Sequence, residues 1–257
     1  MSITPKEKEY NLKVLNNFIG YGNPEAKYWF MGIEEGGSSW VADDRDSTNL
    51  LEVYKNKFSN GPYHLNLEEM NKLNFSTATQ DERSSYLDIV RELINDTKKG
   101  HRIVKNTDLG SVTGNEFLLN LSPLGFSSKD NGANHDYKNL FPIDNRDEFF
   151  NNSYNYYEDR ISALKVYFDK YFTEGKYLFC FGNKYWNNFK DLLIKLDRIK
   201  NVSQFETKPF DIISRNNVNT FEEYTKDKIK IYLLYHPSYG WLTFEQIKSL
   251  LNNDNPS

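Results

Sequence analysis

Four short apolar runs, each stopping at a polar turn, stand out along the chain. They are KYWFMG (Lys27–Gly32), EFLLNLSP (Glu116–Pro123), KYLFCFG (Lys176–Gly182) and KIKIYLLY (Lys228–Tyr235). Short continuous apolar runs bounded by polar turns are typical of parallel strands that are buried on both faces. The pattern therefore predicts four strands, each of which ends in a polar loop.

Longer segments between these runs repeat their apolar residues at helical spacing. The helix candidates cover residues 6–22, 81–97, 156–175 and 183–196. Gly175 follows the last periodic residue of the third segment, as expected for a helix C-cap. This alternation predicts an α/β fold with three layers, α/β/α, around a central four-stranded, mainly parallel sheet.

Two segments fit the alternation poorly. We interpret residues 39–80 as a helical or irregular insertion after the first strand, and residues 205–227 as an extra strand or a connecting loop. The length of 257 residues suits one large domain that carries an insertion. We therefore expect a single domain over residues 1–257.

Composition limits the possible partners. The net charge of −4 provides no general basic field for nucleic acid, so any DNA binding must come from a local patch. The N-terminus lacks an apolar signal segment, and no stretch approaches about 18 apolar residues. We therefore expect a cytoplasmic protein with no membrane partner. Cys180, the only cysteine, lies in an apolar run, which is typical of a buried structural thiol.

The ends of the four strands are the candidate functional site. In open α/β sheets, ligands bind beyond the carboxyl ends of the strands. The strand ends read GIEEGG (Gly32–Gly37), LLNLSP (Leu118–Pro123), FGNKYW (Phe181–Trp186) and HPSYGW (His236–Trp241). We expect these four polar ends to meet at one edge of the sheet.

In this order, the four motifs resemble the uracil-DNA glycosylase superfamily. In that family the first strand ends in Gly-x-Asp/Asn-Pro or a variant, the second carries an Asn, the third ends in Gly before a helix, and the fourth ends in His-Pro-Ser. The resemblance covers the core of the chain and implies an enzyme that flips a base out of DNA and cleaves its N-glycosidic bond. Glu35 departs from the pattern because the family usually has Pro there, and residues 39–80 are not accounted for.

Two residues take catalytic roles under this resemblance. Glu34 stands where the family has the Asp or Asn that positions water, and a carboxylate there stabilises the positive charge that builds on the sugar. Whether Glu34 or Glu35 faces the site stays open. His236, held by Pro237 at a strand end, would donate a hydrogen bond to the base oxygen on which negative charge develops.

Base recognition is implied at three places. Asn120 interrupts an apolar strand, and its amide offers a donor and an acceptor to the edge of a flipped pyrimidine. Gly36 stands where the uracil-restricted branch has a Tyr that blocks the C5 side of the base, so strict uracil specificity is not implied. Trp40 or Phe126 is the candidate that stacks on the base.

DNA contacts are implied at two loops. After the fourth strand, the family contacts a phosphate and then inserts an apolar wedge into the base stack. After the third strand, a helix N-terminus and a nearby cation attract phosphate, and an Asn there is a candidate cap. The candidate DNA-binding residues are Ser238, Tyr239, Trp241, Leu242, Gly182, Asn183 and Lys184.

No cofactor is expected. His64, His101 and His135 show no metal-ligand spacing, and one cysteine cannot form the metal cluster that some branches of the family carry. We expect a monomer whose partner is DNA.

The leading hypothesis is a monofunctional DNA glycosylase that acts on uracil, mismatched thymine or a C5-modified pyrimidine such as those of phage DNA. Its pathway would be repair or defence against phage. One alternative is a non-catalytic member of the same fold that binds nucleic acid or protein, favoured by the net charge and by the Glu34–Glu35 pair, which repels phosphate. A second alternative is an unrelated α/β hydrolase that acts on a nucleotide or nucleoside.

Overall fold

The computed structural model describes residues 3–34, 50–66, 69, 114–124, 140–143, 145–150, 155–211, 220–236 and 242–252. The strands are β1 (Phe18–Gly22), β2 (Tyr28–Glu34), β3 (Tyr63–Leu65), β4 (Glu116–Ser122), β5 (Tyr177–Phe181), β6 (Glu206–Pro209), β7 (Thr220–Lys226) and β8 (Ile229–Leu234). The helices are α1 (Pro5–Asn17), α2 (Leu50–Lys57), α7 (Arg146–Phe150), α8 (Tyr156–Tyr171), α9 (Trp186–Lys195) and α10 (Phe244–Asn252), with 3₁₀ turns η2 (Asn183–Tyr185) and η3 (Val202–Gln204).

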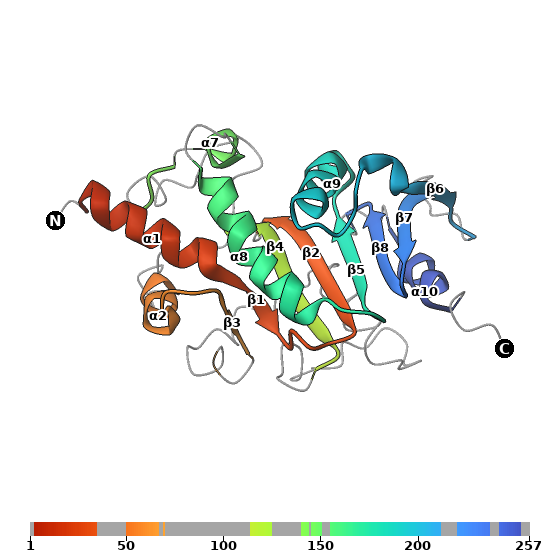
Figure 1. Cartoon of the computed structure of the whole chain (residues 1–257), viewed down its shortest axis with the longest axis horizontal. Coiled ribbons are helices and arrows are strands. Elements are labelled where there is room, and N and C mark those ends of the chain that lie inside the picture. Colours follow the sequence, from red (N-terminus) through yellow and green to blue (C-terminus); the bar gives the residue numbers. More distant parts are fainter. Residues whose placement is uncertain are drawn as a thin grey trace.

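The strands form one mixed sheet in the order β3-β1-β4-β2-β5-β8-β7-β6 (Figure 1). The prediction of a four-stranded sheet is wrong in number, because the described part of the sheet has eight strands. The four predicted strands are nevertheless its centre, β4-β2-β5-β8, and they run parallel to one another. Antiparallel pairing of β1 with β4, and of β7 with β8 and β6, extends the sheet on both sides.

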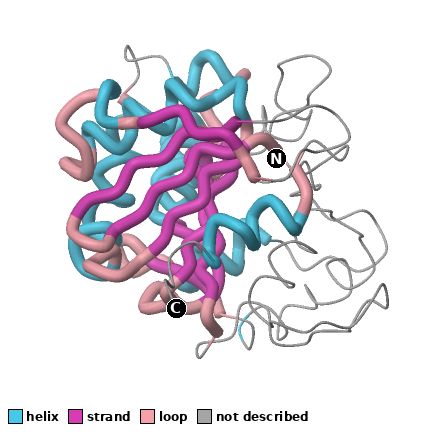
Figure 2. Tube along the Cα trace, turned by 90° about the vertical axis from the view of Figure 1, so that its right-hand side faces the viewer, coloured by secondary structure: helices cyan, strands magenta, loops and turns pink. Residues whose placement is uncertain are grey.

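Successive residues of the central strands pack on opposite faces of the sheet, as the pleat requires. On one face, Trp29 and Met31 belong to a large core cluster that also contains buried side chains of α1, α8 and α9. On the other face, Phe30 stacks on Phe179, with ring centroids 5.2 Å apart, in a second cluster that includes residues of α10. Helices therefore contact both faces, and Figure 2 shows the strands between them.

The first helix is shorter than the apolar pattern predicted. Thr4 caps it, in a capping box with Glu7, but it ends at Asn17, and the next five residues form β1. Gly20 explains the close contact of β1 with β4, because a Cβ there would lie 2.0 Å from the carbonyl oxygen of Leu118. The prediction of a helix over residues 6–22 is therefore wrong in its last part.

The predicted C-cap at Gly175 is also wrong. Helix α8 ends at Tyr171, and Phe172 is its C-cap. Gly175 lies further on, in the turn that leads into β5, where its φ of +83° suits glycine.

The segments that fitted poorly extend the sheet. Within residues 39–80, α2 is helical as expected, and β3 pairs in parallel with β1. Residues 205–227 add two antiparallel strands, β6 and β7, which confirms the extra strand. The helix predicted at residues 81–97 lies outside the described residues.

Two further expectations were tested. Cys180 is fully buried, as expected for a structural thiol. Across the described ranges, no helix has both the length and the apolar character that crossing a membrane requires.

Candidate functional site

The carboxyl ends of the four central strands lie at one edge of the sheet, which we call the carboxyl rim. The pairing of Glu34 with Ser122 aligns the ends of β2 and β4. The pairing of Phe181 with Leu234 aligns the ends of β5 and β8. Pairing of Met31 with Cys180 joins these two halves. The expected convergence of the strand ends is therefore confirmed for the backbone.

The order of these strands singles out the middle of the rim. The chain passes from β2 to β4 on one side, and later to β5 and β8 on the other side. The connections diverge between β2 and β5, which makes this a topological switch point. Ligands of open α/β sheets bind at such points. Glu34 ends β2 there, and Gly182 directly follows β5.

Asn120 lies on β4 near the rim, paired with Gly32 of β2. Its side chain is half-buried, and no hydrogen bond to its amide group is found among the described residues. Its backbone carbonyl, in contrast, accepts a hydrogen bond of 2.6 Å from Nη2 of Arg160. The strand is thus held in place while the amide keeps its donor and acceptor.

Arg160 on α8 holds the backbone near the end of β4 in place, a role that the sequence did not reveal. Its side chain is buried, 1% exposed, and the guanidinium also donates to the carbonyl of Leu121 at 3.2 Å and to that of Asn16 at 3.0 Å. A further hydrogen bond reaches the carbonyl of Phe18. One cation therefore ties together the end of α1, the start of β1 and the end of β4. It appeared in the sequence only as a charged residue on an amphipathic helix.

Gly182 begins the turn after β5 with a φ of +125°, a conformation that favours glycine. Asn183 and Lys184 follow in η2, and both are exposed. Asn183 does not cap the helix as predicted, because neither η2 nor α9 has a side-chain cap and the N-cap of α9 is Tyr185. Lys184 lies with Nζ 5.8 Å from the centroid of the Tyr185 ring.

His236 lies two residues beyond the end of β8 and is exposed at the rim. Desolvation by surrounding atoms nevertheless lowers the pKa of its imidazole below the ordinary value. A neutral imidazole at neutral pH carries one N–H donor and one acceptor. The ring is therefore suited to donate a hydrogen bond without bringing a full charge to the site.

Leu242 does not suit the role that the sequence assigned to it. The residue is only 2% exposed and belongs to the second core cluster, which also contains Ile247 and Leu250 of α10. Such burial argues against Leu242 as a wedge that enters DNA.

The other site predictions lie outside the described residues. They concern Glu35, Gly36, Trp40, Phe126, Ser238, Tyr239 and Trp241, together with the side chain of Glu34, of which only the backbone is described.

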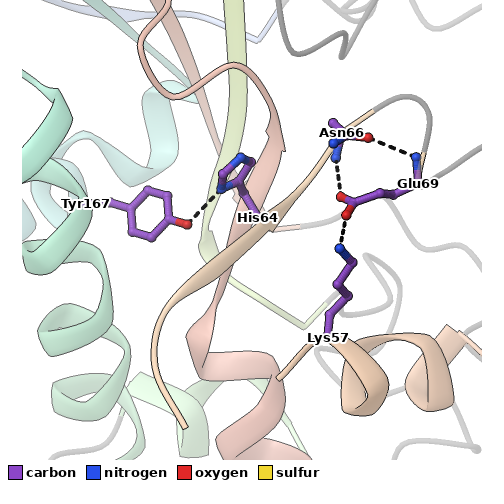
Figure 3. A network of polar contacts seen from close by, with 5 residues as sticks. All are labelled: Lys57, His64, Asn66, Glu69 and Tyr167. Atoms are coloured by element: carbon purple, nitrogen blue, oxygen red, sulfur yellow. Dashed lines mark hydrogen bonds and ion pairs between the residues drawn. The ribbon is translucent and has the colours of Figure 1, made fainter. Parts of the chain in front are cut away.

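A second histidine, His64, has a structural role in this protein. His64 on β3 is half-buried, and its Nδ1 lies 2.8 Å from the hydroxyl of Tyr167 (Figure 3). Desolvation and the charges of Lys57 and Lys170 lower the pKa of His64. Beside it, Glu69 accepts from the backbone N–H of Asn66 at 3.0 Å and pairs with Lys57. His64 thus holds an outer strand against α8, away from the four central strand ends.

No group of three or more His, Cys, Asp or Glu residues suited to a metal ion occurs in the part of the chain that the structure describes. Comparison with family models, curated proteins and solved structures gives no match to this chain.

Proposed function

We propose that this protein is a monofunctional, metal-independent DNA glycosylase of the uracil-DNA glycosylase superfamily. The supporting observation is the alignment of four strand ends whose motifs, in chain order, resemble that family. Each motif is short and common by itself. The sheet brings the four motifs to one rim, around a topological switch point, where ligands of open α/β sheets bind.

The proposed reaction is hydrolysis of the bond between the sugar C1′ and the base nitrogen. As this bond breaks, its electron pair moves to the base and positive charge builds on the sugar. Glu34 stabilises that charge and orients the water whose oxygen bonds to C1′, and it accepts the proton that the water loses. The base leaves as an anion, which His236 stabilises by donating a hydrogen bond to the O2 oxygen.

The state of His236 supports this role. Its lowered pKa keeps the imidazole neutral near pH 7, so the ring donates a hydrogen bond to the leaving base and does not transfer a full proton. Preorganised donors directed at developing charge typically contribute about 10²–10³ in rate.

The amide of Asn120 supports the proposal that a base is recognised at the same rim. A half-buried amide with no hydrogen-bond partner in the described part of the chain is able to bind a ligand that has both a donor and an acceptor. The edge of a flipped pyrimidine has both. Because Gly36 stands in place of a blocking Tyr, we propose uracil, mismatched thymine or a C5-modified pyrimidine as the base.

DNA contact in this proposal is local. Exposed Lys184 and Asn183 lie at the start of the α9 region, beside the switch point, where a phosphate would meet a cation and a polar side chain. We further propose a three-layer α/β/α arrangement for the whole chain and a monomer in solution.

A base-release assay tests the proposal. Purified protein is incubated with single- and double-stranded oligonucleotides that carry uracil, a G·T mismatch, 5-hydroxymethylcytosine or its glucosylated form, and alkali then cleaves the abasic sites. We expect release from at least one of them, and its loss in Glu34→Gln and His236→Ala. Glu35→Gln, measured beside them, tells which of the two carboxylates acts.

The matched control is Glu52→Gln, which removes an exposed carboxylate on α2 that pairs with Lys55. It should release base at the wild-type rate. Binding without release from any substrate would overturn the proposal in favour of a non-catalytic DNA-binding protein. A protein that neither binds the oligonucleotides nor releases a base would also overturn the proposal, and the resemblance would then concern the fold alone.

A further inference from the structure

The last residue of β8 receives two hydrogen bonds on a single carbonyl. The backbone N–H of Gly182 donates to the oxygen of Leu234 at 2.9 Å, and the indole Nε1 of Trp186 donates to the same oxygen at 3.2 Å. The first bond continues the pairing of β5 with β8. The second comes from a side chain at the start of α9. From this contact we infer that Trp186 is a positioning residue that sets the direction in which the chain leaves β8, and thereby aims His236.

The indole contacts both residues that precede His236. Besides the Leu234 carbonyl, it meets the ring of Tyr235 edge to face, with ring centroids 5.5 Å apart and planes at 77°. A hydrogen bond to backbone and an edge-to-face ring contact both depend on direction. Together they restrict how the backbone turns between the last paired residue of the strand and the histidine.

Trp186 itself stands on a firm support. It is the first residue of α9, whose Phe189, Leu192 and Leu193 are fully buried against the sheet. Gly182, through its positive φ, turns the chain so that the start of α9 faces the end of β8. A site residue held by a packed helix is more precisely placed than one held by its own loop.

The inference rests on the proposed function only for its catalytic consequence. If His236 stabilises the leaving base, a small change in its direction weakens a contact made in the transition state. A loss of aim should therefore lower the rate of the chemical step and leave substrate affinity nearly unchanged. The positioning itself is measurable in the free protein.

Trp186→Phe is the variant that tests it, because phenylalanine keeps an aromatic ring near Tyr235 but lacks the N–H donor, together with the rest of the five-membered ring. The first measurement is the set of ¹H–¹⁵N signals of the His236 ring in the free protein, assigned from the spectrum of His236→Ala. We expect these signals to shift or broaden, while those of His64 stay unchanged. The second is single-turnover base release, which should slow about fivefold to tenfold at unchanged substrate Kd.

Trp29→Phe is the matched control. Trp29 is fully buried on β2, and among the described residues its indole N–H has no hydrogen-bond partner. Its substitution removes the same atoms and destabilises the core, but it should leave the His236 signals as they are. Unchanged His236 signals in Trp186→Phe, or changes no larger than those in Trp29→Phe, would overturn the inference. Changed signals in a protein that releases no base would uphold the positioning and count against the glycosylase proposal alone.

Discussion

The two ends of the central sheet differ in how their polar groups are used. At the amino end, Nζ of Lys176 donates to the carbonyl of Pro24 at 2.9 Å, and Nδ2 of Asn23 donates to the carbonyl of Gly114 at 3.0 Å. At the carboxyl rim, the amide of Asn120 has no hydrogen bond among the described residues, and His236 is exposed. At their amino ends the central strands are therefore joined by hydrogen bonds between their turns. At their carboxyl ends, Asn120 and the exposed His236 lie at one edge of the sheet.

This difference separates stability from function. Polar groups that bond to one another at a strand end fix the turns and leave little for a ligand. The half-buried amide of Asn120, which has no hydrogen bond among the described residues, is a cost that a binding role explains. We therefore expect substitutions at the amino end to change the free energy of unfolding, and substitutions at the carboxyl rim to change activity.

The largest expected effect is at the carboxyl rim. His236→Ala removes the proposed donor to the leaving base, and should slow single-turnover base release by about 10²–10³-fold. Because His236 is exposed, the free energy of unfolding should stay within about 0.5 kcal/mol of wild type. Urea denaturation of the same preparation measures this. A comparable loss of both quantities would show that the rim is a structural element.

The opposite result is expected at the amino end. Asn23→Ala removes the hydrogen bond to Gly114 and a second one, of 2.9 Å, from the backbone N–H of Glu25 to Oδ1. The free energy of unfolding should fall by about 1–3 kcal/mol, as measured by urea denaturation. The rate of base release per folded molecule should not change. A large drop in that rate would contradict the assignment of stability to the amino end and activity to the carboxyl rim.

Lys176 adds a pH dependence to the amino end. Burial lowers its pKa from 10.5 to about 8, so between these values the unfolded chain binds more protons than the folded protein. The free energy of unfolding should therefore rise with pH in this window, by about 1 kcal/mol between about pH 7.5 and pH 9. Lys176→Met should remove that rise. An identical pH profile of wild type and variant would exclude Lys176 as its source.

The smallest effect concerns DNA affinity. Lys184→Ala should weaken oligonucleotide binding severalfold and reduce the slope of log K against log salt by about 1, because one phosphate contact is lost. Lys228→Ala is the control, since Lys228 pairs with Glu174 at the amino end of β8. Fluorescence anisotropy at several salt concentrations compares them. Equal losses of oligonucleotide affinity in the two variants would indicate that the overall charge of the protein, and not a local patch at Lys184, attracts DNA.

The centre of the sheet was predictable because its strands are continuous apolar runs, as burial on both faces demands. The outer strands were harder to predict from the sequence, for a different reason in each case. β1 (FIGYG) follows α1 directly, after only two polar residues, Asn16 and Asn17, that belong to the helix, and β3 (YHL) is too short to show a period. β6 (ETKP) is mostly exposed, so its residues carry no core signal.

The candidate site was predictable to a similar degree. Gly182 and His236 lie at the rim because each follows an apolar run, and Asn120 lies near it because it interrupts such a run two residues before the strand ends. Arg160 and Trp186 were missed, since their roles depend on carbonyls that are distant in sequence: Leu234 is 48 residues from Trp186. Leu242 looked like part of an exposed loop and is instead buried beside α10, because the core cluster there is completed by tertiary packing.

The most direct test of the central claim, that the strand ends act as one site, is a double-mutant cycle on base release. Asn120→Ala and His236→Ala are measured singly and together in single-turnover assays on the best substrate. If both residues contact the same base, the change in activation free energy of the double variant should differ from the sum of the two single changes by at least about 0.5 kcal/mol. Strict additivity, or single variants that release base at the wild-type rate, would contradict the account.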